Sequence, residues 1–159
     1  MRILRPLAVL TAAAALALLA TVPGASAATP PAPSLWLHAV AGRSPDGTLT
    51  VSYAYRCQPR YGGSRGYAIV SLTVTERLAG GGSAVGYSPG GDPAYLVCDA
   101  RAHQGAQSVV PASGAFVPGS AFLRADVLAC PVSEIDCAMP TQRRVVQIVP
   151  QDPQAVARP

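Results

Sequence analysis

Apolar and polar residues alternate from Thr48 to Cys57, and this two-residue period requires extended backbone over that stretch. The side chains of a β-strand point alternately to its two faces, so one face here is apolar and the other is polar. The apolar face carries Leu49, Val51, Tyr53, Tyr55 and Cys57. Cys57 is therefore expected on the buried side of a strand.

The same alternation recurs along the rest of the chain, whereas the 3.6-residue period of an amphipathic helix is not found. Further strands are expected over 34–41, 67–76, 121–130 and 143–149, with short strands near 84–87, 94–98 and 106–110. Seven or eight short strands at this spacing predict an all-β domain, an immunoglobulin-like antiparallel β-sandwich. We expect this single domain to occupy residues 34–149.

The first 27 residues have the three parts of a signal peptide. Arg2 and Arg5 precede an apolar run over 6–22, and the small residues of Ala25-Ser26-Ala27 follow it. The alternative is a membrane anchor, but the run is short for the ~20 residues that span a bilayer. We expect cleavage before Ala28, a Pro-rich leader over 28–33, a flexible tail over 150–159, and a secreted, extracellular protein with no membrane attachment.

The charge of the mature chain argues against a nucleic-acid partner. Loss of Arg2 and Arg5 leaves ten basic residues against eight acidic ones, a net charge of about +2. The basic residues do not form a run that would mark a phosphate-binding surface. We also expect a monomer that needs no cofactor.

The four cysteines predict two disulfides, because an even number in an exported chain favours complete pairing. Four cysteines allow three connectivities, and we favour Cys57–Cys98 with Cys130–Cys137. The first would join the inner face of a central strand to a later strand, and the second would close a hairpin loop. The alternative is a structural zinc site, but such sites use close Cys-x-x-Cys pairs, which this sequence lacks. No metal site is expected.

The stretch GGSRG, residues 62–66, has the spacing of a serine hydrolase's nucleophile elbow, and Asp99 and His103 follow it in the matching order. An elbow joins a buried strand to a helix, whereas this stretch lies between two expected strands, where glycines serve a turn. Ser64 is therefore interpreted as a turn residue, no catalytic residue is expected, and the chain is not expected to be an enzyme. His38 and His103 are interpreted as structural, since they lack a third ligand or a nucleophile.

Four stretches, DGTLTVSYAYRC, VCDARAH, VPGSAFLRADVLAC and RRVVQIV, follow one another between residues 46 and 149. As an ordered set they resemble a family of secreted actinobacterial immunoglobulin-like domains of unknown function. That family has a Cys-Asp-Gly-x-x-His segment, and Ala100 stands here in the place of its glycine. The resemblance implies the fold and the export, and it implies no known activity.

Two loops contain the candidate binding residues, which are Arg60, Tyr61 and Arg65 in one and Val132, Glu134 and Ile135 in the other. Loops cluster at each end of such a sandwich, and interfaces favour Tyr and Arg. We therefore expect a non-enzymatic module that binds an extracellular protein or ligand through these loops. The alternatives are a protease inhibitor presenting the Cys130–Cys137 loop, a carrier of small apolar ligands, or solvated loops whose arginines only neutralise Glu134 and Asp136.

Overall fold

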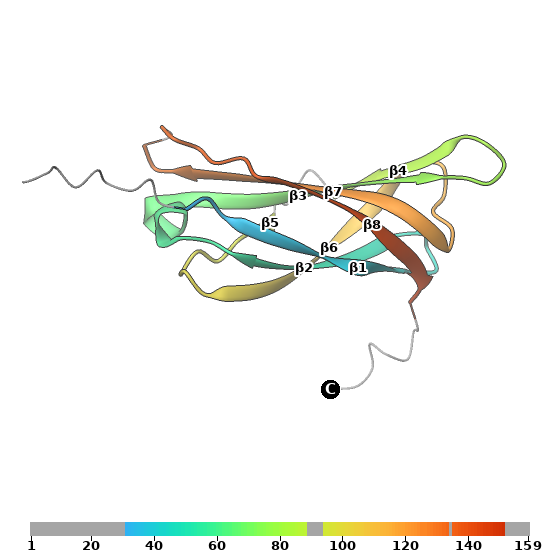
Figure 1. Ribbon diagram of the computed structural model, residues 1–159, viewed down its shortest axis with the longest axis horizontal. Helices are drawn as coiled ribbons and strands as arrows, with labels where there is room; N and C mark the ends of the chain where they lie inside the picture. Colours follow the sequence, from blue (N-terminus) through green and yellow to red (C-terminus); the bar gives the residue numbers. More distant parts are fainter. Residues whose placement is uncertain (1–30, 89–93, 134, 152–159) are drawn as a thin grey trace, which may run out of the picture.

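The structure, a computed structural model, describes residues 31–88, 94–133 and 135–151 (Figure 1). The expected signal peptide, the start of the leader and the tail from residue 152 onward lie outside the described residues. The strands are β1 (Ser34–Arg43), β2 (Leu49–Arg56), β3 (Gly66–Arg77), β4 (Ser83–Tyr87), β5 (Ala94–Tyr95), β6 (Ala102–Ser113), β7 (Gly119–Pro131) and β8 (Thr141–Pro150). Two short 3-10 helices, η1 (Pro59–Tyr61) and η2 (Gly63–Arg65), connect β2 to β3. The all-β architecture agrees with the alternation in the sequence.

The strands form one sheet in the order β4-β6-β2-β1-β8-β7-β3-β5, and β4 pairs with β3 as well as with β6. This additional pairing closes seven strands into a barrel, and β5 lies outside the ring on β3. In Figure 1, β3 and β7 lie on one side and β1 and β2 on the other. The structure therefore differs from the expected sandwich of two separate sheets, because hydrogen bonds join the layers along both edges.

β1 makes one of these joins, because its second half pairs with strands on both of its sides. Its first half, from Ser34 to Leu37, pairs antiparallel with β2, and its second half, from Val40 to Arg43, also pairs in parallel with β8. The parallel pair departs from the expected antiparallel sheet. Alternation within a strand cannot reveal it, since the direction of a neighbouring strand depends on connections far away in the sequence.

One face of each long strand fills the interior of the barrel. The residues expected on inner faces are buried, namely Leu35, Leu37, Leu49, Val51, Tyr53, Tyr55, Cys57, Ala68, Val70, Leu72, Val74, Leu123, Ala125 and Val127. Burial of each Leu or Val side chain contributes about 1.5–3 kcal/mol relative to exposure. The core is therefore predicted well by the two-residue period alone.

Glu76 is an acidic residue that lies on this inner face. Its position is in phase with Val74, and its side chain is 2% exposed. The Glu76 Oε2 accepts a hydrogen bond from the backbone N–H of Val117 at 3.0 Å. This bond connects the end of β3 to the segment that leads into β7.

Both expected disulfides are present. Cys57–Cys98 connects the end of β2 to the segment before β6, with a sequence separation of 41, and Cys130–Cys137 closes the loop between β7 and β8. The favoured connectivity is confirmed, and sulfurs bonded in this way cannot act as zinc ligands. Two disulfides are typical of a protein from an oxidising environment. Within the described ranges, helices of the length and apolar character needed to cross a membrane are not found.

Candidate functional site

The connection from β2 to β3 contains GGSRG and approaches the end of β7 closely. Ser64 is exposed within η2, and the strand β3, not an α-helix, follows it. A Cβ atom added at Gly66 would collide with the carbonyl oxygens of Cys130 and Arg60. The glycine is thus required by the close passage of this connection against β7, as expected for a turn and unlike a nucleophile elbow.

Tyr61 lies inside the fold, contrary to its expected place on the binding surface. Its side chain is fully buried, because η1 turns the ring into the core immediately after Pro59. The guanidinium of the half-buried Arg60 lies over the Tyr61 ring, 4.4 Å from its centroid, and also contacts the Tyr61 hydroxyl. Arg60 and Tyr61 therefore act as a packed pair, and only Arg60 reaches the surface.

The second predicted loop lies directly beside the first, as expected. The backbone N–H of Val132 donates a hydrogen bond to the carbonyl of Arg65 at 2.8 Å. The side chains of Val132 and Ile135 are 66% and 69% exposed, although both are apolar. Glu134, the remaining candidate in this loop, lies outside the described residues. One surface thus presents an arginine beside two exposed aliphatic side chains.

Tyr67 extends this surface and was not among the sequence candidates. It is the antiparallel partner of Cys130, and its ring is 37% exposed on the outer face of β3. Its outward phase, opposite Ala68, was the signal in the sequence that could have identified it. We call Arg60, Arg65, Tyr67, Val132 and Ile135 the loop tip.

Asp99 and His103 form a hydrogen-bonded pair next to the Cys57–Cys98 disulfide. The Asp99 Oδ1 and His103 Nε2 are 2.7 Å apart, and the His103 ring stacks on Tyr55 with centroids 5.4 Å apart. The hydrogen bond from His103, supported by the N–H of Arg101, lowers the pKa of Asp99 below its ordinary value. Across the described ranges, no group of three metal-ligating side chains is found, and Ser64 lies on a different connection. We interpret the pair as a clamp on the turn that begins at Cys98.

That turn contains a strained residue. Ala100 has a φ of 67°, in the left-handed region that favours glycine. Its N–H donates to the carbonyl of Cys57 at 2.8 Å, and its carbonyl accepts from the Arg56 Nε at 2.7 Å. The backbone conformation is therefore fixed by neighbours on both sides. Ala100 is also the position at which the resembling family has glycine.

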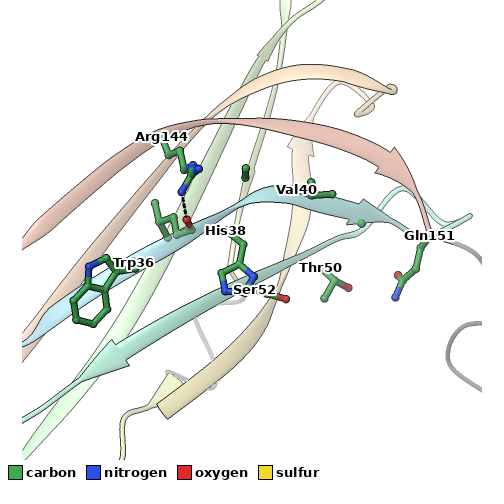
Figure 2. A pocket seen from close by; sticks show the side chains of 10 residues that line it. Trp36, His38, Val40, Thr50, Ser52, Arg144 and Gln151 are labelled. Carbon is green, nitrogen blue, oxygen red and sulfur yellow. Dashed lines mark hydrogen bonds between the residues drawn. The ribbon is translucent and has the colours of Figure 1, made fainter. Parts of the chain in front are cut away.

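A groove that the sequence did not predict lies along β1 (Figure 2). Between Leu37 and Ala41, β1 takes four steps while β2 takes two, from Tyr53 to Val51. Two extra residues are accommodated there, and because two is even, the inner face of β1 keeps its phase on both sides of the bulge. The bulge leaves His38, Ala39 and Val40 exposed. The groove has a volume of about 710 Å³ and is lined by Trp36, Leu37, His38, Ala39, Val40, Gly42, Thr50, Ser52, Arg144 and Gln151.

A comparison with protein-family models finds none that matches the chain, and a search of the curated proteins finds no match either. The loop tip and the groove are therefore the features from which a function can be inferred.

Proposed function

We propose that this protein is a secreted, non-enzymatic module that binds an extracellular protein through the loop tip. The observation that carries the proposal is the hydrogen bond from the Val132 N–H to the Arg65 carbonyl, which makes two distant loops into one surface. Large contiguous apolar patches on the surface of a soluble protein often mark interaction sites. Here Val132 and Ile135 are exposed in the loop whose backbone bonds to Arg65, and Tyr and Arg, residue types of the loop tip, are enriched at interfaces.

The loop tip is held before any partner binds. The Cys130–Cys137 disulfide restricts one loop, and the packing of Arg60 on the buried Tyr61 restricts the other. Ordering a flexible loop on binding costs about 0.5–1.5 kcal/mol for each immobilised side chain. A loop that is already ordered avoids most of this cost, so more of the contact energy contributes to affinity.

We also propose a more specific description of the fold. We infer that the barrel is an immunoglobulin-like sandwich whose two layers are joined at their edges by β1 and β4. The ring order supports this inference, since β6-β2-β1 and β8-β7-β3 are each a run of neighbouring strands that could form one layer, with β4 pairing to both. The left-handed φ of Ala100, at the glycine position of the resembling family of secreted actinobacterial domains, supports the resemblance. We also propose that the chain is exported and that the mature protein begins at Ala28.

The test is capture of a partner from the culture supernatant of the producing organism. Wild-type protein and the variant Val132→Ser/Ile135→Ser are immobilised at equal density, and the bound proteins are compared by mass spectrometry. A matched control, Val110→Ser/Val145→Ser, removes exposed apolar side chains from strands outside the loop tip. We expect a protein retained by the wild type and the control and lost from the loop-tip variant. Equal retention by all three would contradict the proposal.

A protease inhibitor is the second candidate, because the exposed loop is clamped at both ends by Cys130 and Cys137. The two candidates are separated by one assay with a subtilisin-like protease. Inhibition that depends on Val132 would assign the loop to a protease cleft. Capture of a partner without inhibition would favour the interaction module.

A further inference from the structure

β1 and β8 run parallel but pair along only part of their lengths. Their ladder extends from Val40 opposite Gln147 to Arg43 opposite Pro150. Three residues before this ladder, Leu37 and Arg144 would face each other if the pairing continued. At this position the side chain of Arg144 takes the place of a backbone hydrogen bond between the strands, because its Nη1 donates to the Leu37 carbonyl at 2.6 Å. The two strands separate at this point, as Figure 2 shows, and a notch opens between them.

The notch is bordered by two strand edges. β2 pairs with the opposite side of β1, and β7 pairs with the opposite side of β8. Residues 34–39 of β1 and 141–146 of β8 therefore face each other across the notch, and no strand of the described chain pairs with these two edges. Unpaired strand edges present backbone N–H and C=O groups at the spacing that another strand needs.

The two strands that border the notch carry only positive charge, although Asp126 of the neighbouring β7 accepts a hydrogen bond from Thr141 and interacts with Arg143. β1, β2 and β8 contain no Asp or Glu, whereas they carry Arg43, Arg56, Arg143 and Arg144. Arg143 and Arg144 line the notch itself. The bond to Leu37 uses one donor of Arg144, and a guanidinium has five donors arranged to bind a carboxylate.

The outer rim of the notch is partly apolar. Trp36 and Val40 are 54% and 51% exposed, and both line the groove that continues from the notch. Side chains on alternate positions of an extended ligand fall on one face, so one such row would lie against Trp36. In strand addition by a peptide, main-chain hydrogen bonds give affinity and contacts with alternate side chains give specificity, and the edges of the notch, Trp36 and Arg144 could supply these.

We propose that the notch between β1 and β8 is a second binding site, which accepts an extended peptide segment with a carboxylate side chain placed at Arg144. This site is separate from the loop tip, and it does not depend on the function proposed for the tip. The peptide adds a strand to one or both free edges, and its carboxylate pairs with Arg144.

Trp36 makes the test direct, because it is the only tryptophan of the chain and lines the groove. Three end-blocked hexapeptides are titrated against the full mature protein, and the fluorescence of Trp36 is recorded. The first alternates valine and threonine and has one central glutamate. The second has lysine in place of glutamate, and the third has proline next to the glutamate, which removes a backbone donor. We expect the glutamate peptide to bind about tenfold more tightly than either of the others.

The protein side of the test uses Arg144→Gln, with Arg77→Gln as the matched control on β3. Arg77 is exposed and lies on a strand that is not adjacent to the notch. Arg144→Gln should weaken the glutamate peptide about tenfold, and Arg77→Gln should leave its affinity unchanged. Hydrogen exchange should also slow on binding at residues 34–39 or 141–146, which a ligand bound through side chains alone would not cause.

Three results would overturn the proposal. The first is absence of a fluorescence change with the glutamate peptide, and the second is equal affinity for the glutamate and lysine peptides. The third is a response of Trp36 to soluble oligosaccharides in place of peptides, which would assign the groove to a carbohydrate. Because the peptide series uses the wild-type protein, these results do not depend on whether Arg144→Gln folds.

Discussion

Val132 and Arg65 are 67 positions apart in the sequence, yet the N–H of Val132 donates to the carbonyl of Arg65 at 2.8 Å. The bond joins the disulfide-closed loop after β7 to the connection between β2 and β3. It follows from the pairing of β3 with β7, in which Gly66 lies opposite Pro131. The placement of the proposed binding surface therefore depends on the longest strand pair of the barrel.

The two disulfides should contribute unequally to stability. In the chain-entropy model, closing a loop of 41 residues contributes about 4 kcal/mol and closing one of 7 residues about 2.5 kcal/mol. Cys57→Ala/Cys98→Ala should therefore lower the free energy of unfolding more than Cys130→Ala/Cys137→Ala does. Urea denaturation of both variants measures the difference. An equal loss, or a larger loss for the short loop, would contradict the ranking.

Ala100→Gly should stabilise the protein. An L-residue in the left-handed region costs roughly 1–2 kcal/mol, while glycine adds about 0.4–1 kcal/mol of unfolded-state entropy. With φ at 67°, the gain should exceed the loss by about 0.5–1 kcal/mol. Ala102→Gly, an exposed position in β6, is the control and should destabilise by about 0.5–1 kcal/mol. Thermal melts that rank the two variants in the reverse order would show that Ala100 is not strained.

Glu76 should be needed as a hydrogen-bond acceptor and not for its charge. Glu76→Ala leaves the N–H of Val117 without this partner and opens space in the core, so it should cost about 2–3 kcal/mol. Glu76→Gln keeps an acceptor oxygen and nearly the same volume, and it should cost about 1 kcal/mol or less. Denaturation midpoints of the two variants test the assignment. Equal losses would mean that the charge matters more than the bond.

The pair formed by Asp99 and His103 should make stability depend on pH in the acid range. The hydrogen bond from His103 lowers the pKa of Asp99 in the folded protein below 3.8, its ordinary value. A lowered pKa contributes stability that is present above the unfolded value and is lost as the pH falls through the folded value. The free energy of unfolding should thus fall less steeply with acid for Asp99→Asn than for the wild type, at pH values below 3.8.

His103→Phe provides the control for this pH dependence, because it keeps a ring to stack on Tyr55 and removes the hydrogen bond. In that background, Asp99→Asn should change the pH profile much less. If it changes the profile as much as in the wild type, the acid dependence arises from the Arg101 N–H and not from His103.

Local alternation was sufficient to predict the strands, the inner faces and the phase of Cys57, because these features depend on neighbours two residues away. It could not predict the barrel closure through β4 or the parallel pairing of β1 with β8, since both depend on long-range contacts. Tyr61 was wrongly expected at the surface because η1 interrupts the two-residue period after Pro59. The groove depends on the two extra residues in β1, which only the register with β2 reveals. Glu76 was overlooked because a carboxylate is rarely expected in phase with a core.

The most direct test of the central claim places a photo-crosslinking side chain at position 132. A benzoylphenylalanine in place of Val132 is irradiated in the culture supernatant, and the same residue in place of Val145 serves as the control, since both side chains are strongly exposed. A binding surface at the loop tip predicts one covalent adduct of defined mass from position 132 and none from position 145. Adducts from position 145 alone, or the same adducts from both positions, would contradict it.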